Sequence, residues 1–525
     1  MNFLLHHLLH RSAKRFPEKE ALVCGTQRLS YQSVARSAAG LGTGLRQAGL
    51  EKGDRVGIYL PASISQALSI FGTSYAGGVF VTINSQLFPK QVLHIAQDCQ
   101  IKTLITTASR LTNLADTLKQ IPSLEFVVIV ADSEPPAVPL PTHRFDTLCD
   151  QPPLTRADDI AIGRDLAALL YTSGSTGQPK GVMLSHAQLL AGTAIVSDYL
   201  EITERDRILA ILPFSFDAGL NQLATAFEQG ATLVIKTFIF AREIVQTLAS
   251  ENITALAGVP TLWTLIVQPN ASLQKQPLPH LRYITNTGGA LCETVLTRLR
   301  SLLPATQIFL MYGLTEAFRS TYLPPSELDR RPTSIGKAIP NTEILVIDEQ
   351  GNPCKAGEIG ELVHRGPTVS MGYWQQPELT AQRLRPHPLL PPGLAEKEQV
   401  CYSGDLVRID EEGFLYFVGR LDSLIKSSGF RLSPTEVEAV LMQSDWLQSA
   451  AVIGVADQML GQAVKAFVVP KADLELDIQQ LVRFSAERLP RYMVPKQVEI
   501  LSFLPTTTSG KIDYPSLRLR EVQAA

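Results

Sequence analysis

The sequence predicts an α/β protein with a large N-terminal domain of doubly wound sheets and a small α+β C-terminal domain. Over residues 1–160, short apolar runs such as 55–60 alternate with helical patterns, which is typical of parallel strands joined by helices. The chain has 525 residues, more than one hydrophobic core ordinarily contains, so two or more domains are expected. Near the C-terminus, a helical pattern at 435–441 and strand patterns at 450–455 and 463–470 predict the smaller domain.

The composition is that of an ordinary globular protein, 45% hydrophobic and 18% charged, with a net charge of −3. Because no basic surface is indicated, a nucleic-acid partner is not expected. The six cysteines have no close pairs, which predicts neither a zinc site nor a disulfide framework, and we expect reduced thiols in a cytoplasmic enzyme. Leucine pairs near the N-terminus fit a helix better than a signal peptide, and no apolar run approaches the roughly 20 residues that span a bilayer.

Residues 171–186 combine glycines and small hydroxyl residues with one lysine, a composition suited to holding phosphate groups. The candidate phosphate-binding residues are Thr172, Ser173, Gly174, Ser175, Thr176, Gly177 and Lys180. The segment does not match a Walker A loop, because its lysine follows Pro179 and is itself followed by a glycine. A flexible Ser/Gly linker is the alternative, and the apolar runs on both sides of the segment argue against it.

Further motifs follow in order along the chain, at 311–317, 402–406, 419–426 and 504–513. Together with the phosphate loop they resemble the AMP-forming adenylating enzymes, which include acyl-CoA synthetases, luciferases and the adenylation domains of nonribosomal peptide synthesis. The resemblance covers roughly residues 3–513 and is nearest to free-standing amino-acid carrier-protein ligases, including those for L-proline, and to related acyl ligases.

The resemblance divides the chain into two domains. It implies that residues 1–420 bind ATP and the acid. Residues 421–525 would form a mobile domain with a hinge near Asp422, which swings between an adenylating pose and a thiol-transfer pose. Segments 360–366 and 371–374 also resemble parts of the family, and we interpret them as scaffold.

Three residues are predicted to act on the reacting groups. Glu316 is a hard oxygen ligand suited to the Mg²⁺ that a triphosphate requires, with Thr315 beside it to bind a phosphate oxygen. A helix N-terminus with Thr315 and Glu316 in its first turn is the competing structural interpretation. Lys511, in a second Ser/Thr/Gly-rich loop, would bridge the acid carboxylate and the α-phosphate and stabilise the charge that develops during attack.

The nucleoside is expected beside an apolar strand at 283–291 that ends in a glycine pair, where a flat ring can lie on the backbone. Asp405 would accept hydrogen bonds from both ribose hydroxyls, with Arg420 beside it. A tight turn, and a hairpin with a surface ion pair, are the structural alternatives. The predicted adenine and ribose contacts are Gly288, Gly289, Ala290, Tyr312, Gly313, Asp405 and Arg420.

The acid-binding site is expected to include Phe216-Asp217, because amino-acid-activating relatives carry Phe-Asp at this place. An aspartate in an apolar pocket requires a cation, such as an α-ammonium or a ring imino group, although Asp217 could instead cap a helix. Arg319 is unusual for the family and leaves three possibilities: pairing with Asp217, binding a substrate carboxylate, or pointing away. The predicted substrate contacts are Asp217, Ala218, Asn221, Ala257, Thr285, Thr287, Met311, Arg319 and Ser320.

These features predict an enzyme that uses ATP and Mg²⁺ to adenylate a carboxylic acid, with release of pyrophosphate. A thiol then displaces AMP to form a thioester. We expect an amino acid such as proline, loaded onto the phosphopantetheine of a separate carrier protein in nonribosomal peptide biosynthesis, since no carrier segment follows Lys511. The alternatives are an AMP-forming CoA ligase for a fatty or aryl acid, and a non-catalytic nucleotide-binding protein.

Overall fold

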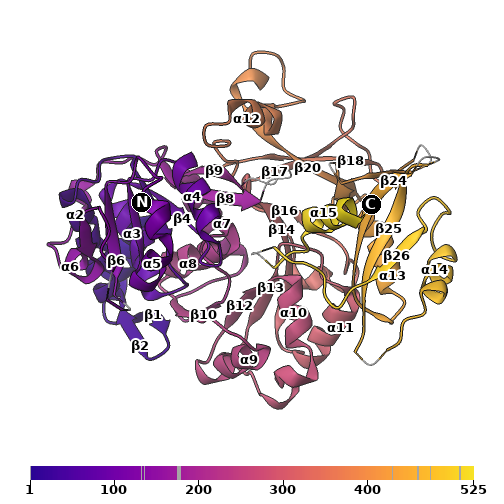
Figure 1. Ribbon diagram of the computed structural model, residues 1–525, viewed down its shortest axis with the longest axis horizontal. Helices are drawn as coiled ribbons and strands as arrows, with labels where there is room; N and C mark the ends of the chain where they lie inside the picture. The colour runs from indigo at the N-terminus through magenta and orange to yellow at the C-terminus, as the bar shows by residue number, and fades with distance from the viewer. Residues whose placement is uncertain are drawn as a thin grey trace.

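The computed structural model of the chain has a mixed α/β fold with a large N-terminal domain and a small C-terminal domain, as the sequence predicts (Figure 1). The residues it leaves undescribed are Met1, Asp132, Pro135, 174–178, Asp422, 428–429, 458–459, Asp473, 508–509 and Ala525. All six cysteines are free thiols. Within the described part of the chain, no helix has the length and apolar character needed to cross a membrane.

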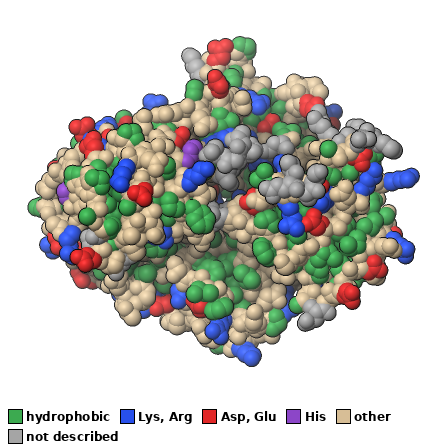
Figure 2. All heavy atoms as spheres, viewed as in Figure 1, with side chains coloured by type: hydrophobic (Ala, Val, Ile, Leu, Met, Phe, Trp, Pro, Cys, Tyr) green, Lys and Arg blue, Asp and Glu red, His purple; other side chains and the backbone are tan. Residues whose placement is uncertain are grey.

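The visible face of the molecule carries charged side chains of both signs. Figure 2 shows lysine and arginine interspersed with aspartate and glutamate on this face, which accords with the small net charge of −3. Apolar side chains lie between them, as is normal for a folded protein.

The largest sheet has nine strands in the order β16-β15-β14-β13-β12-β10-β11-β1-β2. Its parallel strands are β1 (Glu20–Cys24), β10 (Arg207–Ala210), β11 (Thr232–Ile235), β12 (Ala255–Gly258), β13 (Tyr283–Asn286) and β14 (Gln307–Leu314). The antiparallel strands at its two ends are β2 (Gln27–Ser30), β15 (Ala317–Leu323) and β16 (Lys337–Ala338). Parallel pairing brings the carboxyl ends of β12, β13 and β14 to one edge.

A second sheet has seven strands in the order β7-β6-β5-β3-β4-β8-β9. The strands are β3 (Arg55–Tyr59), β4 (Val79–Thr82), β5 (Thr103–Thr107), β6 (Phe126–Val130), β7 (Thr142–Arg144), β8 (Leu166–Ser173) and β9 (Pro179–Ser185). Strands β8 and β9 pair antiparallel on either side of the predicted phosphate loop.

Helices of the large domain cover the faces of these two sheets (Figure 1). They are α1 (His6–Arg15), α2 (Tyr31–Gln47), α3 (Ile64–Ala76), α4 (Pro89–Asp98), α5 (Ala108–Leu118), α6 (Phe145–Cys149), α7 (His186–Tyr199), α8 (Asp217–Gln229), α9 (Ala241–Ser250), α10 (Pro260–Ile266) and α11 (Glu293–Leu302). Helix α12 (Pro377–Arg383) lies apart from both sheets, at the top of Figure 1. Alternation of strand and helix produces this doubly wound arrangement, because each strand must bury both faces.

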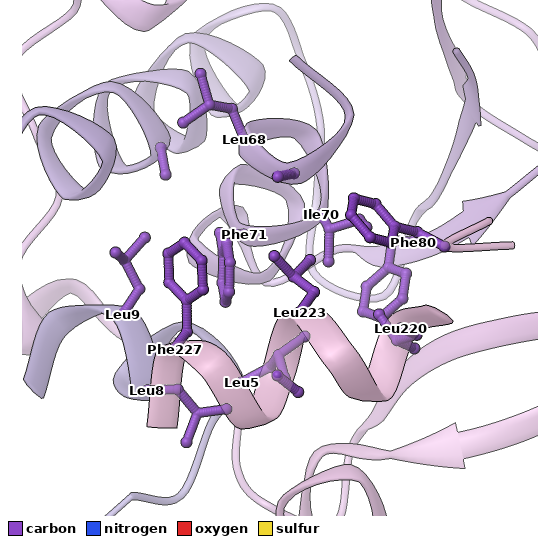
Figure 3. Close-up of a cluster of buried hydrophobic side chains, with 14 of the residues drawn as sticks. Leu5, Leu8, Leu9, Leu68, Ile70, Phe71, Phe80, Leu220, Leu223 and Phe227 are labelled. Atoms are coloured by element: carbon purple, nitrogen blue, oxygen red, sulfur yellow. The ribbon is translucent and has the colours of Figure 1, made fainter. Parts of the chain in front are cut away.

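Helix α8 is held in the core between the two sheets, and this fixes the position of its first residue, Asp217. Figure 3 shows Leu220, Leu223 and Phe227 of α8 among buried side chains of α1 and α3. The rings of Phe227 and Phe71 lie 5.0 Å apart, centroid to centroid. Fully buried apolar side chains of this size each contribute about 2–3 kcal/mol, so the helix is a rigid support.

Two smaller sheets complete the molecule. The first contains β17 (Glu343–Ile347), β18 (Ile359–Arg365), β19 (Leu384–Pro386), β20 (Gln399–Ile409) and β21 (Leu415–Arg420). The second, coloured orange to yellow in Figure 1, contains β22 (Ile425–Ser427), β23 (Phe430–Leu432), β24 (Leu447–Asp457), β25 (Gly461–Pro470) and β26 (Gln497–Ile500). It packs with α13 (Pro434–Met442), α14 (Ile478–Ala486) and α15 (Tyr514–Ala524), and this α+β unit forms the C-terminal domain.

A buried carboxyl group in the small domain, that of Glu438, has a raised pKa. Burial raises the pKa of Glu438, on α13, to about 7. Its Oε1 accepts hydrogen bonds from the Tyr514 hydroxyl, at 2.8 Å, and from the backbone N–H of Val452, at 2.7 Å. The contacts link α13 to α15 and β24.

We expect the stability of the small domain to fall as the pH rises from about 5 to about 7, because the unfolded chain releases the Glu438 proton at a lower pH than the folded one. Glu438→Gln keeps an oxygen to accept both hydrogen bonds and removes the titration. Denaturant unfolding between pH 5 and pH 8 should therefore show a loss of up to about 3 kcal/mol in the wild type and a flatter profile in the variant. Parallel profiles would contradict this interpretation.

Candidate active site

Several predicted substrate-binding residues lie at the carboxyl edge of the nine-stranded sheet. Ala257 on β12 pairs with Thr285 on β13, and Thr285 pairs with Phe309 on β14. Just beyond β13, the backbone N–H of Thr287 donates to the Gly258 carbonyl at 3.0 Å. Ligands of open α/β sheets bind outside the carboxyl ends of the strands, so this edge is the expected place for a site.

Thr315 and Glu316 form the turn of a β-hairpin between β14 and β15. The interpretation of these residues as a helix N-terminus is therefore wrong: a strand follows them, and the hairpin closes with Leu314 opposite Ala317. The turn places the Glu316 carboxylate at the carboxyl end of β14. In this position it can serve as a metal ligand, as the sequence predicts.

Glu316 is held by a residue that the sequence analysis assigns to the scaffold. The hydroxyl of Tyr373 donates to Glu316 Oε1 at 2.5 Å, and burial together with the Glu316 carboxylate raises the pKa of Tyr373. Arg383 Nε lies 3.5 Å from the same hydroxyl, and its guanidinium also donates to the Tyr402 carbonyl at 2.9 Å. The carboxylate is therefore oriented by a hydrogen-bonded chain from Arg383 through Tyr373.

A second group of polar residues surrounds the predicted ribose site. The Tyr312 hydroxyl donates to Asp405 Oδ2 at 2.5 Å, and Arg420 Nη1 lies 3.1 Å from Asp405 Oδ1. Asp405 and Arg420 are partners across the β20–β21 hairpin. The hairpin of the structural alternative is therefore present, with a pair that joins a buried carboxylate, Asp405, to an exposed guanidinium, Arg420. Burial and the adjacent Asp405 keep the pKa of Tyr312 well above its usual value, so its hydroxyl remains a donor.

His364 stacks on the ring of Tyr312. The two rings are nearly parallel, at 12°, with centroids 6.2 Å apart. Burial lowers the pKa of His364 to about 3, so the imidazole is neutral at physiological pH. The sequence does not indicate a role for His364, because a contact between strands more than fifty residues apart leaves no local pattern.

Lys511, from the small domain, lies beside Gly288 of the large domain. A Cβ atom at Gly288 would stand 3.2 Å from Lys511 Cε and 3.9 Å from its Nζ. Gly510 is equally close to α10, with a Cβ position 3.2 Å from Thr261 Oγ1. Gly288 has a φ of 81°, which L side chains rarely adopt. Beyond Gly288, Gly289 and Ala290 are exposed.

The flanks of the predicted phosphate loop are firmly anchored. Thr172 pairs with Lys180 on neighbouring strands, and the Tyr171 hydroxyl donates to Asp98 Oδ2 at 2.5 Å. The backbone N–H of Trp374 donates to the Gly181 carbonyl at 2.8 Å. This hydrogen bond connects β9 to the segment that contains Tyr373. The predicted residues Gly174, Ser175, Thr176 and Gly177, and the predicted hinge Asp422, lie outside the described residues.

Asp217 is the first residue of α8, where its carboxylate accepts the N–H of Ala218 at 2.8 Å. Asp217 therefore binds the first turn of its own helix, although Phe216 is the N-cap residue, and it is half-buried. Asn221 lies one turn further along the same face, with an amide nitrogen that is buried and has no partner among the described residues.

Arg319 is buried on β15, with 6% of its surface exposed and a φ of 80°. Its Nε has no hydrogen-bond partner, and within the described ranges its guanidinium forms no ion pair. The structure therefore does not show the suggested pair with Asp217. Ser320, beside it, is fully buried, and its hydroxyl donates to the Ala317 carbonyl at 3.2 Å.

Comparison with known proteins identifies the family. The family model for the AMP-binding enzyme matches residues 9–374, and that for the AMP-binding enzyme C-terminal domain matches residues 436–511. Feruloyl-CoA synthase of an Amycolatopsis species is 31% identical, and the match covers 97% of both chains. Delta-poly-L-ornithine synthetase of Acinetobacter baumannii is also 31% identical, and a linear gramicidin synthase of Brevibacillus parabrevis is 30% identical. The chain spans only 37% and 10%, respectively, of these last two proteins.

Solved structures agree over nearly the whole length. An anthranilate CoA ligase in complex with anthranoyl-AMP is 26% identical with a TM-score of 0.88, covering 99% of this chain and 98% of that one. ATP-bound MatB from Rhodopseudomonas palustris is 26% identical with a TM-score of 0.87, covering 98% of both chains. The chain therefore belongs to the AMP-binding enzyme family, and the relatives that it matches over nearly their full length include CoA ligases.

We expect Gly288→Ala to slow ATP–pyrophosphate exchange about tenfold or more, because the added methyl group would displace Lys511. Gly25→Ala is the matched control. Its φ of 59° imposes similar backbone strain, but no atom lies within 4 Å of its Cβ position. Equal rates in the two variants would show that the contact between Lys511 and Gly288 has no role in the reaction.

Proposed function

We propose that the enzyme adenylates an amino acid with ATP and transfers the acyl group to a phosphopantetheine thiol, on a separate carrier protein or on CoA. The observation that supports an amino acid is Asp217. This half-buried carboxylate at the edge of the site has a backbone N–H as its partner, and no cation, within the described ranges. An α-ammonium or a ring imino group would supply the missing positive charge. Proline remains one candidate.

The residues present fit ATP and Mg²⁺. The Glu316 carboxylate is a hard oxygen donor, oriented by Tyr373 and close in sequence to Thr315, so these residues would hold Mg²⁺ and a phosphate oxygen. Bound there, the metal would offset the charge of the triphosphate. The backbone around Gly288 and the ring of Tyr312 would border the adenine, with Asp405 on the ribose.

The proposed reaction has two steps. A carboxylate oxygen of the acid attacks the α-phosphorus of ATP, and pyrophosphate leaves with the electrons of the broken P–O bond. Lys511 lies at the end of β13, where its ammonium would stabilise the negative charge of the transition state. The thiol sulfur then attacks the acyl carbon and AMP leaves. No side chain forms a covalent bond to the substrate, so catalysis rests on positioning and charge.

A CoA ligase for an aryl or fatty acid is the second candidate. The relatives that this chain matches over nearly their full length include feruloyl-CoA synthase and a long-chain-fatty-acid–CoA ligase of Bacillus subtilis. A non-catalytic nucleotide-binding protein is less well supported, because a simple binder has no need for Lys511 beside Gly288. A cytoplasmic location accords with the use of ATP and six free thiols.

We expect one or a few amino acids to drive ATP–pyrophosphate exchange in a panel that also contains fatty and aryl acids. Asp217→Asn keeps an acceptor for the Ala218 N–H but removes the charge, and should lower exchange about 100-fold. Asp198→Asn, at an exposed position on α7, is the control. Exchange with acyl or aryl acids that is indifferent to Asp217 would contradict the amino-acid proposal and support a CoA ligase.

The contact between Tyr373 and Glu316 predicts a metal-dependent defect. Tyr373→Phe should raise the Mg²⁺ concentration for half-maximal exchange about tenfold, because Glu316 loses the donor that orients it. Tyr416→Phe removes a hydroxyl that donates to Asp410 at 3.2 Å, away from Glu316, and serves as the control. An unchanged Mg²⁺ requirement in Tyr373→Phe would mean that this hydrogen bond does not support metal binding.

A further inference from the structure

Arg319 carries a permanent positive charge into the interior without a counter-ion among the described residues. A guanidinium remains protonated at any physiological pH, so its burial cannot be relieved by losing a proton. The side chain is 6% exposed, and its Nε is fully enclosed with no acceptor. Arginine is almost never buried in this way unless it is paired, so an anionic ligand is the missing partner.

The backbone at Arg319 has a strained, left-handed conformation. Its φ of 80° is rare for a residue other than glycine, and such strain persists only where surrounding contacts enforce it. On the neighbouring strand, Gly313 leaves room for the backbone of Arg319, since a Cβ at Gly313 would lie 3.2 Å from the Arg319 Cα. A left-handed residue interrupts the alternation of side chains along β15, and the strand bears this distortion beside the turn that carries Glu316.

The charge of Arg319 acts on a tyrosine that packs against Met311. Burial raises the pKa of Tyr199, and the positive charge of Arg319 opposes that rise. The Tyr199 hydroxyl lies 3.8 Å from the sulfur of Met311, and the Tyr199 ring stacks on Tyr322 at 4.2 Å. Met311 and Tyr312 are consecutive on β14, so their side chains point to opposite faces, and Tyr199 lies on the Met311 face, away from the predicted nucleoside site.

The carboxylate of the acid that attacks ATP is not the anion that pairs with Arg319. It must reach Lys511, which lies beside Gly288 at the end of β13. Arg319 is on β15, two strands further along the sheet, a separation of about 10 Å. One small acid can therefore reach both cations only with a separate negative group for each.

We propose that Arg319 binds a second, side-chain carboxylate of the substrate, so that the enzyme activates an acidic α-amino acid of the aspartate or glutamate type. A planar guanidinium and a carboxylate form paired hydrogen bonds that fix orientation as well as charge. The unpartnered amide nitrogen of Asn221, on α8, is a further donor at the acid site. Among amino-acid substrates, this inference disfavours proline, which has no group to neutralise Arg319.

The identification of an amino acid rests on the proposed function, whereas the second carboxylate rests on Arg319 alone. The two are separated by ATP–pyrophosphate exchange with acids that differ by one group at a time. The five-carbon set is glutamate, 2-aminopentanoate, glutarate and pentanoate. The four-carbon set is aspartate, 2-aminobutanoate, succinate and butanoate. In each set, one comparison removes the ammonium and the other removes the distal carboxylate.

In the wild type we expect glutamate or aspartate to exceed its monocarboxylate amino-acid partner by at least about 100-fold in exchange. Arg319→Met is similar in length and uncharged, and should reduce that ratio to about one, because the advantage of the distal carboxylate depends on the guanidinium. Since the ratio is taken within each protein, partial loss of folded enzyme does not affect it. Arg298→Met, at an exposed arginine on α11, should keep the wild-type ratio.

The possible outcomes separate the two proposals. If glutarate or succinate works as well as its amino analogue and Arg319→Met removes the preference for the second carboxylate, Arg319 has the proposed role and the amino-acid proposal fails. If monocarboxylate amino acids are preferred and Arg319→Met leaves the ratio unchanged, the Arg319 inference is overturned while the amino-acid proposal stands. Absence of exchange with all four dicarboxylates also overturns it.

Discussion

The contact of Lys511 with Gly288 is the constraint on which the rest of the site depends, because it places a cation of the small domain at the edge of the large one. Gly288 has a φ of 81° and no side chain, which allows the lysine to approach the backbone. Asp405, Glu316 and Asp217 lie on the large domain, on a strand, in a hairpin turn and on a packed helix, respectively. The proposed site therefore combines groups of both domains, and it requires them to be docked as seen here.

The charges of the site are held by partners of different kinds. Asp405 is fixed by Tyr312 and Arg420, and Glu316 is oriented by Tyr373, so both carboxylates are preorganised before any ligand binds. Asp217 and Arg319 differ, since no described side chain neutralises either of them. We interpret these two uncompensated charges as places where the substrate supplies the opposite charge. The proposals about the identity of the substrate rest on them.

Much of the fold followed from local pattern. The apolar run at 55–60 corresponds to β3, and the patterns at 435–441, 450–455 and 463–470 correspond to α13, β24 and β25. Local pattern did not distinguish a hairpin from a helix start at Glu316, because a turn residue and an N-terminal helical residue have the same polarity.

Long-range contacts explain what the sequence left unpredicted at the site. Tyr373 reaches Glu316 across 57 residues, and the stacking of His364 on Tyr312 depends on how two sheets meet. The sequence marked Arg319 as unusual but left its role open, because burial and a left-handed backbone arise from packing and not from residue type.

The central claim is that Lys511 of the small domain completes the adenylation site. Its most direct test is to separate the two half-reactions in Lys511→Ala. We expect ATP–pyrophosphate exchange to fall about 100-fold or more, while thioester formation from a chemically prepared acyl-adenylate and CoA or a loaded carrier persists. Exchange at the wild-type rate, or equal loss of both half-reactions, would contradict the account.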